Sequence, residues 1–130
     1  MLERIDTMRM AHELGAHAAN RQRVIAANVA NADTPGYRRK LVSFEPDRDF
    51  GRDTGTVRAS RTRHDRAELP QVYAPGHPMA GADGYYLGSN VDLVIEVADA
   101  REASRSYEAN LKMFEQSRQM SAALLELIRR

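Results

Sequence analysis

The sequence changes character at residues 26–37, which read Ala26-Ala27-Asn28-Val29-Ala30-Asn31-Ala32-Asp33-Thr34-Pro35-Gly36-Tyr37. Before this stretch, residues 2 to about 31 contain no proline and one glycine, Gly15, and are rich in Ala, Leu, Met, Arg and Gln. The asparagines of the stretch suit a helix end with left-handed backbone. Pro35 followed by Gly36 fits the centre of a type II turn, because proline presets φ and glycine accepts a positive φ. The stretch therefore predicts a helix that exits into a tight turn.

The residues before this turn have helical periodicity. Their apolar side chains fall mostly three or four positions apart, at Leu2, Ile5, Met8, Ala11, Leu14, Ala18, Ile25 and Val29. Such spacing places the side chains on one narrow stripe of a helix. Residues 1–33 are therefore predicted to form an N-terminal helix.

The other end of the chain predicts a second, longer helix over residues 90–130, with no proline or glycine from Val91 onward. Ser89 or Asn90 is expected to cap its start, with Asp92 in the first turn. A 3-4 repeat typical of a coiled-coil or bundle seam runs along it, at Val97, Ala100, Ser104, Tyr107, Leu111, Phe114, Arg118, Ser121, Leu125 and Ile128. The polar members make this a weak seam.

These helices predict burial that is shared with other chains. A helix of ~38 residues spans ~57 Å, which a globule of this size cannot cover along its whole length. The core is also thin, because aromatic residues make up 6% of the 130 residues and tryptophan is absent. We therefore expect part of the C-terminal helix to pack against neighbouring molecules.

The middle of the chain, residues 34–89, predicts a small β-rich insert. It contains seven of the eight glycines, and residues 74–84 favour turns throughout. Short strand candidates are Lys40–Phe44, Thr56–Thr62, Gln71–Tyr73 and, more weakly, Tyr85–Leu87. The expected fold is mainly α with a small β insert, in the order helix, β-hairpin-rich middle segment, helix.

Catalytic and metal-binding patterns are missing from the sequence. The chain contains no cysteine, which excludes disulfides, thiolate metal sites and cysteine nucleophiles. His12 and His17 diverge by about 140° on a helix, so they are poorly placed to share a metal. Glu13, Glu96 and Glu102 fall on helices, where a solvated face is the favoured interpretation. The sequence therefore predicts a protein that is not an enzyme and has no cofactor or metal.

Charge and hydropathy indicate whether the chain binds nucleic acid, spans a membrane or carries a secretory signal. Nineteen Lys and Arg face eighteen Asp and Glu, a net charge of +1, and no stretch approaches the ~18 apolar residues of a membrane span. The N-terminus lacks an apolar segment, so no cleaved secretory signal is expected. One basic strip contains Arg58, Arg61, Arg63 and Arg66. A nucleic-acid-binding module is the low-prior alternative, because no aromatic residue between Phe50 and Tyr73 could stack on bases.

The stretch at 26–37 resembles the N-terminal signature of the bacterial flagellar rod and hook proteins, Asn-hydrophobic-Ala-Asn-x-x-Thr-Pro-Gly-Tyr. The match is nearly complete, at Asn28, Asn31, Thr34, Pro35, Gly36 and Tyr37. Further stretches resemble the proximal-rod members of this family, at Tyr37–Glu45, Pro75–Pro78, Asp83–Tyr85, Asn90–Asp92 and Ala103–Asn110. Two sister proximal-rod proteins fit: the loop at Pro75–Pro78 and the run Ser104–Asn110 favour one, whereas the plain turn at Asp33–Gly36 is typical of the other.

The resemblance implies a structural subunit of the flagellar drive shaft. Such a subunit assembles with copies of itself, other rod proteins, the junction protein between the MS ring and the rod, and the MS ring. It is exported unfolded by the flagellar type III apparatus without a cleaved signal, and lies in the periplasm and within the MS ring. Its terminal helices surround the export channel and its insert packs outside.

Two sets of residues are candidates for this function. The helix exit is expected to be fixed by the motif residues Asn28, Asn31, Thr34, Pro35, Gly36 and Tyr37. The assembly seam is expected to consist of Ile5, Leu14, Ile25, Val29, Val97, Tyr107, Leu111, Phe114, Leu125 and Ile128, within and between subunits.

Overall fold

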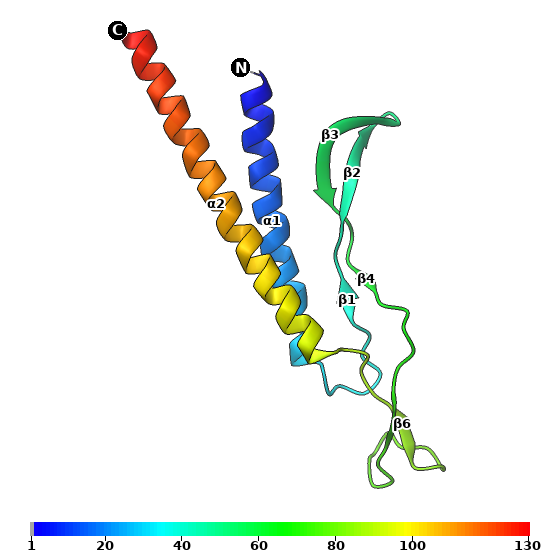
Figure 1. Ribbon diagram of the computed structural model, residues 1–130. Helices are drawn as coiled ribbons and strands as arrows, with labels where there is room; N and C mark the ends of the chain where they lie inside the picture. The colour runs from blue at the N-terminus through cyan, green and yellow to red at the C-terminus, as the bar shows by residue number, and fades with distance from the viewer. Residues whose placement is uncertain (1) are drawn as a thin grey trace.

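A computed structural model describes residues 2–130, with the side chains of residues 2–7, 49, 53, 55 and 56 outside the description. Two helices, α1 (Leu2–Ala30) and α2 (Leu93–Arg129), pack against each other in opposite directions (Figure 1). The chain between them forms short strands. This confirms the predicted fold, mainly α with a small β insert.

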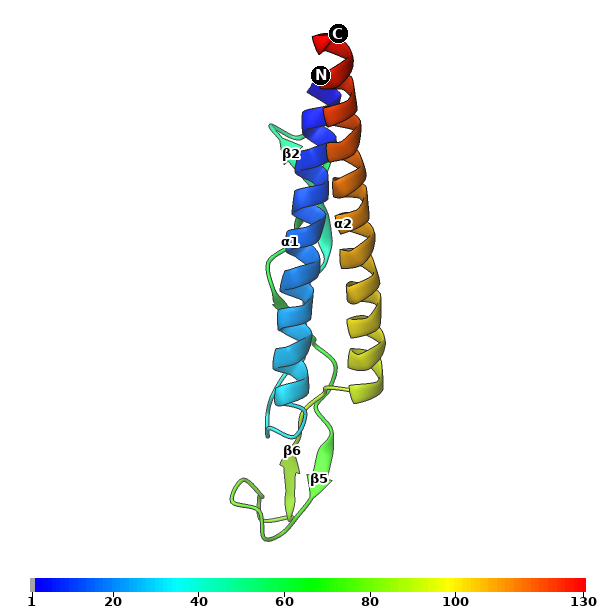
Figure 2. The same cartoon turned by 90° about the vertical axis from the view of Figure 1, so that its left-hand side faces the viewer.

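The insert contains three separate two-stranded antiparallel pairs. The strands are β1 (Lys40–Leu41), β2 (Phe44–Asp49), β3 (Arg52–Ala59), β4 (Arg63–His64), β5 (Gln71–Tyr73) and β6 (Tyr85–Leu87). β1 pairs with β4, β2 with β3 and β5 with β6. The β2–β3 hairpin lies beside α1, which contacts β1 and β3, whereas the β5–β6 hairpin extends beyond the end of the helix pair (Figures 1 and 2).

The strands differ in part from their prediction. β5 and β6 occupy the predicted residues, but the candidate Lys40–Phe44 is divided between β1 and β2, and β2 runs on to Asp49. β2 was not predicted beyond Phe44 because Pro46 and the charged residues around it have low strand propensity. It forms because β3 pairs with it, turning back through Phe50 and Gly51, whose φ values of 48° and 80° are both positive.

The helix ends also correct two expectations. Asp92 caps α2, with its carboxylate accepting a hydrogen bond from the Val94 amide, so the predicted caps Ser89 and Asn90 are wrong. α1 ends without a left-handed asparagine, since Phe50 is the residue other than glycine with a positive φ among the described residues. Instead the backbone amide of Asn31 donates to the backbone carbonyls of Ala27 and Asn28, which continues the helical hydrogen bonding by one residue.

Few apolar side chains are buried by the single chain. Among the described side chains, the buried apolar residues are Ala18, Ile25 and Ala103. Buried polar residues stand beside them, notably His17, Asn28 and Glu96. The interior between α1, α2 and the insert therefore depends largely on polar contacts. No described helix is long and apolar enough to cross a membrane.

Candidate functional site

The side chain of Asn28 joins the end of α1 to the insert and to α2. It is 1% exposed and takes part in four hydrogen bonds. Its Nδ2 donates to the Lys40 carbonyl (3.0 Å) and to Glu96 Oε2 (3.3 Å). Its Oδ1 accepts from the Lys40 amide (2.9 Å) and from the Tyr37 hydroxyl (3.1 Å). Asn28 therefore pairs with strand β1 as a further stretch of backbone would.

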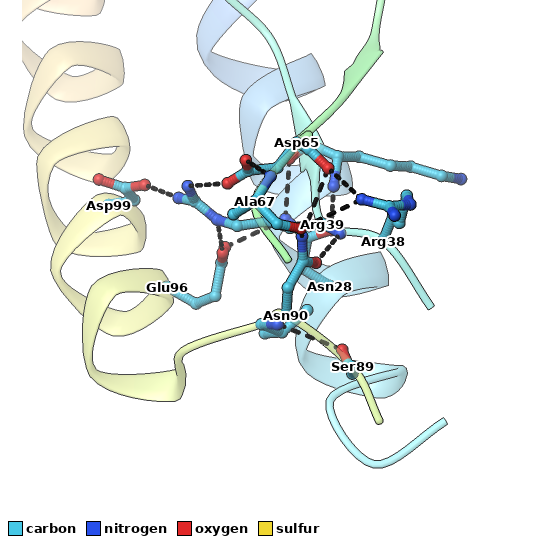
Figure 3. Close-up of polar contacts among 11 residues, drawn as sticks. Asn28, Arg38, Arg39, Asp65, Ala67, Ser89, Asn90, Glu96 and Asp99 are labelled. Atoms are coloured by element: carbon cyan, nitrogen blue, oxygen red, sulfur yellow. Dashed lines mark hydrogen bonds and ion pairs between the residues drawn. The ribbon is translucent and has the colours of Figure 1, made fainter. Parts of the chain in front are cut away.

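A charged cluster lies against Asn28 (Figure 3). The Arg39 Nε donates to Oε1 of Glu96, which is completely buried, and another guanidinium nitrogen lies 2.8 Å from Asp99 Oδ2. The remaining guanidinium nitrogen of Arg39, Nη1, lies 3.9 Å from Asp65 Oδ2. A buried carboxylate is tolerated only where charge and hydrogen bonds compensate it. Arg39 and Asn28 supply that compensation, so the expectation of a solvated Glu96 is wrong.

Asn90 ties the strands of the insert to the start of α2. Its Oδ1 accepts from the Arg39 amide at 2.6 Å, and its Nδ2 donates to the carbonyls of Asp65 and Ala67, both at 3.3 Å (Figure 3). Its own amide donates to the Tyr37 carbonyl at 3.4 Å. We call the set Asn28, Tyr37, Arg39, Asp65, Asn90, Glu96 and Asp99 the polar hub.

The predicted turn lies directly beside the hub. The Tyr37 amide donates to the Thr34 carbonyl at 3.2 Å and Gly36 has φ 74°, which confirms a type II turn with Pro35 at its first central position. The Gly36 amide also donates to the Leu87 carbonyl at 3.0 Å, so the turn contacts β6.

Asn31 and Thr34 hold the turn to the helix. Asn31 Nδ2 donates to the Ala27 carbonyl at 2.8 Å, and the Thr34 hydroxyl donates to Asn31 Oδ1 at 3.1 Å. The motif residues that were predicted to fix the helix exit are thus brought together. Sequence spacing predicted this half of the site. It left out the other members of the hub, Arg39, Asp65, Asn90, Glu96 and Asp99, most of which lie far from the motif in the chain.

Burial perturbs two ionisable groups near the insert. Desolvation, and then the charge of Glu96, raises the pKa of the Tyr37 hydroxyl, which donates a hydrogen bond to Asn28 Oδ1. Desolvation, and then the charge of Arg21, lowers the pKa of His17. The His17 ring lies 3.6 Å from the Phe44 ring, between centroids. His17 is therefore a packing residue between α1 and β2, whereas His12 is exposed.

The predicted seam residues fall into two groups in the single chain. Tyr107, Leu111 and Phe114 line a groove of about 350 Å³ that faces Ala11 and Gly15 of α1. Ile25 is buried and Leu14 is half-buried. Val29, Val97, Leu125 and Ile128 are exposed, the last two at 63% and 80%. Tyr107 and Leu111 are also exposed, at 43% and 46%, although they line the groove. The side chain of Ile5 lies outside the described residues.

The basic strip is partly neutralised by its surroundings. Arg58 Nη1 lies 3.9 Å from Asp47 Oδ1, and Arg63 Nη2 lies 3.7 Å from Glu45 Oε1. The first pair joins β3 to β2, and the second joins β4 to β2. Among the described residues, no group of three His, Asp or Glu side chains could hold a metal ion.

Comparisons with known proteins match both ends of this arrangement. The family described as "Flagella basal body rod protein" matches residues 16–38, and "Flagellar basal body rod FlgEFG protein C-terminal" matches residues 82–127. The first segment carries Asn28 and the second carries Asn90, Glu96 and Asp99. The two matched segments therefore meet at the polar hub.

Full-length relatives decide the family. The "Flagellar basal-body rod protein FlgC" of Agrobacterium fabrum is 38% identical over 118 residues, covering 85% of each chain. That of Salmonella typhimurium is 37% identical, covering 86% of this chain and 88% of the relative. That of Bacillus subtilis is 30% identical, covering 82% of this chain and 86% of the relative.

The chain belongs to the FlgC family of flagellar basal-body rod proteins. As a FlgC-family member, it is a structural subunit of the flagellar basal-body rod, and its relatives are named as basal-body rod proteins. Of the two sister proximal-rod proteins that its sequence resembles, FlgC and FlgB, these relatives support FlgC. Membership implies assembly with other rod and basal-body components.

Proposed function

We propose that the chain is a proximal-rod subunit that transmits torque in the flagellar drive shaft and helps to enclose the export channel. The observation that carries this proposal is the apolar surface that α2 leaves exposed. Leu124, Leu125, Leu127 and Ile128 lie within 37 residues of continuous helix and are at least 45% exposed. Exposed apolar stripes of this kind favour burial against other subunits.

The polar hub supports a mechanical role for the remainder of the chain. A shaft subunit must hold its insert at a constant angle to its helices, and hydrogen bonds constrain direction more than apolar contacts do. Asn28 bonds to the backbone of β1, and Arg39 bonds to Glu96 and Asp99 of α2. A displaced insert would leave the buried Glu96 without its guanidinium partner, which is costly.

The proposed partners are copies of this chain, neighbouring proximal- and distal-rod proteins, the junction protein between the MS ring and the rod, and the MS ring itself. We also propose that the flagellar type III apparatus exports the chain without a cleaved signal, and that the subunit lies in the periplasm and within the MS ring. The seam residues would form the contacts between helices of adjacent subunits.

Leu125→Asp tests the proposal. The substitution adds a charge to an exposed apolar position near the end of α2, so the folded chain should persist while the helix no longer packs against its neighbours. In a strain that lacks the native gene, the variant should be secreted but absent from isolated basal bodies, and swimming should be lost.

Gln119→Asp is the matched control, because Gln119 is an exposed polar residue on the same helix. It should restore swimming as the unchanged chain does. If Leu125→Asp were incorporated and the cells swam, the assignment of the α2 seam would be wrong.

A further inference from the structure

The arginines of the basic strip lie on a part of the insert that the helices do not cover. Among the described residues, β4 contacts β1 and neither helix, and β1 lies between α1 and β4 (Figure 1). Arg63 belongs to β4, Arg58 lies near the end of β3, and Arg61 and Arg66 flank β4. All four residues are exposed. The single chain therefore leaves these charges uncovered.

Arg38 extends the basic strip, and the backbone beside it holds its side chain in place. Its Nη1 donates to the carbonyl of Asp65 at 3.3 Å and to that of Ala67 at 3.1 Å (Figure 3). No other atom of its guanidinium bonds to a residue that the structure describes. Arg38 is itself exposed. Its charge is thus fixed in position and available to a partner.

The strip and Arg38 line two adjoining hollows. The first has a volume of about 410 Å³ and is lined by Arg38, Arg63, His64, Asp65 and Arg66. The second has a volume of about 390 Å³ and is lined by Glu45, Arg58, Ala59, Ser60, Arg61 and Arg63. Because Arg63 lines both, the guanidinium groups surround one continuous depression in the surface.

The carboxylates of the chain leave part of this charge unpaired. The pairs that Arg58 and Arg63 make with β2 are long and exposed, and such pairs contribute little. The side chains of Arg61 and Arg66 make no ion pair or hydrogen bond with any described residue. Asp65, the one acidic residue within 58–66, faces Arg39 instead. Arg61 and Arg66 are therefore free to bind an acidic group from outside the chain.

The surroundings of the strip favour a protein as the source of that group. Nucleic acid is disfavoured because no aromatic residue between Phe50 and Tyr73 could stack on bases. A membrane surface is disfavoured because residues 58–68 contain no large apolar side chain. Glu45 and Asp47 beside the arginines would also face its uniform negative charge. A protein can place single carboxylates against chosen arginines.

The acidic residues of this chain do not form a matching surface. In α1, Glu13 lies 3.9 Å from Arg9, and in the β5–β6 hairpin Asp83 is the one acidic residue. The exposed charges of α2 alternate in sign, at Arg101, Glu102, Arg105, Glu108, Lys112 and Glu115. A second copy is therefore a poor partner for the strip, and a different protein is favoured.

We propose that the basic strip, together with Arg38, binds a cluster of carboxylates on a different protein of the basal body. The inference rests on the proposed rod function and specifies one surface and the chemistry of its partner. Guanidinium groups pair with carboxylates through two parallel hydrogen bonds, which fix direction as well as supply energy. The contact would hold the outer side of the insert at a defined place on its neighbour.

A fluorescent hexaglutamate peptide is the probe for binding in solution, measured by anisotropy with the purified full-length chain at low ionic strength. The chain should bind hexaglutamate and should not bind hexaglutamine. Arg61→Glu combined with Arg66→Glu should weaken binding about tenfold, because it reverses the two unpaired charges. Both positions are exposed and without contacts to described residues, so the fold should persist, which circular dichroism checks.

Arg52→Glu is the matched control, because Arg52 is an exposed arginine at the other end of β3 and lines neither hollow. It should leave hexaglutamate binding nearly unchanged. Vesicles of phosphatidylcholine and phosphatidylglycerol are the second probe. Binding to these vesicles should be weaker than binding to hexaglutamate and should not depend on Arg61 and Arg66.

The same variants test the contact in cells that lack the native gene. The double variant should be secreted but largely absent from isolated basal bodies, and swimming should be reduced, whereas Arg52→Glu should restore swimming. Cells selected for regained swimming should carry a second change, in another basal-body protein, that replaces an Asp or Glu with a neutral or basic residue. Such a change would remove the repulsion from the introduced glutamates.

Unaltered hexaglutamate binding by the double variant would overturn the proposal, and so would normal swimming of its strain. Tighter binding to the anionic vesicles that requires Arg61 and Arg66 would overturn it in favour of a membrane. Compensating changes confined to this chain would overturn it in favour of a second copy. Each of these results leaves the rod function intact if the unchanged chain restores swimming. Failure of the unchanged chain to restore swimming would instead count against the rod function.

Discussion

At the residue scale, Asn28 shows how one amide can determine the path of the chain. Its two side-chain atoms satisfy both backbone groups of Lys40, so β1 begins alongside α1. The same atoms reach Tyr37 and Glu96. No other side chain of similar size offers both a donor and an acceptor in this geometry. An aspartate would lose the donor and would face the carboxylate of Glu96.

Asn28→Ala should therefore destabilise the chain strongly. Removal of the amide leaves the Lys40 backbone and the Tyr37 hydroxyl without these partners, and we expect a loss of about 2–3 kcal/mol in the free energy of unfolding. Urea denaturation followed by circular dichroism measures it. Asn20→Ala is the control, because Asn20 is a half-buried asparagine on the same helix. A loss as small as that of the control would contradict the role of Asn28.

His17 makes the stability depend on pH. Burial of the His17 ring, and then the charge of Arg21, lowers the pKa of His17 from 6.5. Arg21, Phe44 of β2 and Ser106 of α2 line the same cavity as His17. Below about pH 6.5 the unfolded chain therefore binds more protons here than the folded chain does. The free energy of unfolding should decrease as pH falls from 6.5 toward the folded pKa.

The measurement compares variants across that pH range. Urea denaturation at several pH values should show the decrease in the unchanged chain and in His12→Gln, since His12 is exposed. His17→Gln should flatten the pH dependence, whatever its effect on stability at neutral pH. If His17→Gln kept the full slope, another group would have to cause it.

At the scale of elements, the turn after α1 depends on one backbone conformation. Gly36 has φ 74°, and a Cβ atom there would meet nothing within 4 Å. The cost of a side chain at this position is therefore conformational rather than steric. Gly36→Ala should lower the free energy of unfolding by about 1 kcal/mol.

Gly76→Ala separates this cost from a general effect of glycine replacement. Gly76 also has open space around it, and it does not have a positive φ. Its replacement should be neutral or slightly stabilising, because alanine restricts the unfolded chain. Equal losses at both positions in urea denaturation would contradict a conformational origin.

The elements also show what the sequence could predict. The periodicity of α1 and α2 and the turn at Pro35–Gly36 are local signals, so they predicted helices and a type II turn correctly. The partners of Glu96 are not local: Arg39 lies 57 residues away and Asn28 lies 68 residues away. A glutamate on a helix therefore indicated a solvated face, and tertiary packing buried it. β2 was missed for the same reason, because its pairing with β3 outweighs Pro46.

At the scale of the whole molecule, the two helices do not remain in contact along their length. They pack closely where α1 ends and α2 begins, and they diverge toward the termini (Figure 1). Ala103 is completely buried near the close end, whereas Leu125 and Ile128 are mostly exposed near the open end. Stability should therefore decrease along α2 toward its C-terminus.

Hydrogen exchange of the purified monomer can measure this gradient. Amides near Glu96 and Ala103 should exchange slowly, whereas those from about Leu124 onward should exchange much faster, because only intrahelical bonds protect them. Incorporation into rods should slow the exchange of the second group more than that of the first, because amides that are weakly protected in the monomer gain most from burial against other subunits. Uniform protection of α2 in the monomer would show that the chain stabilises the helix alone, without neighbouring subunits.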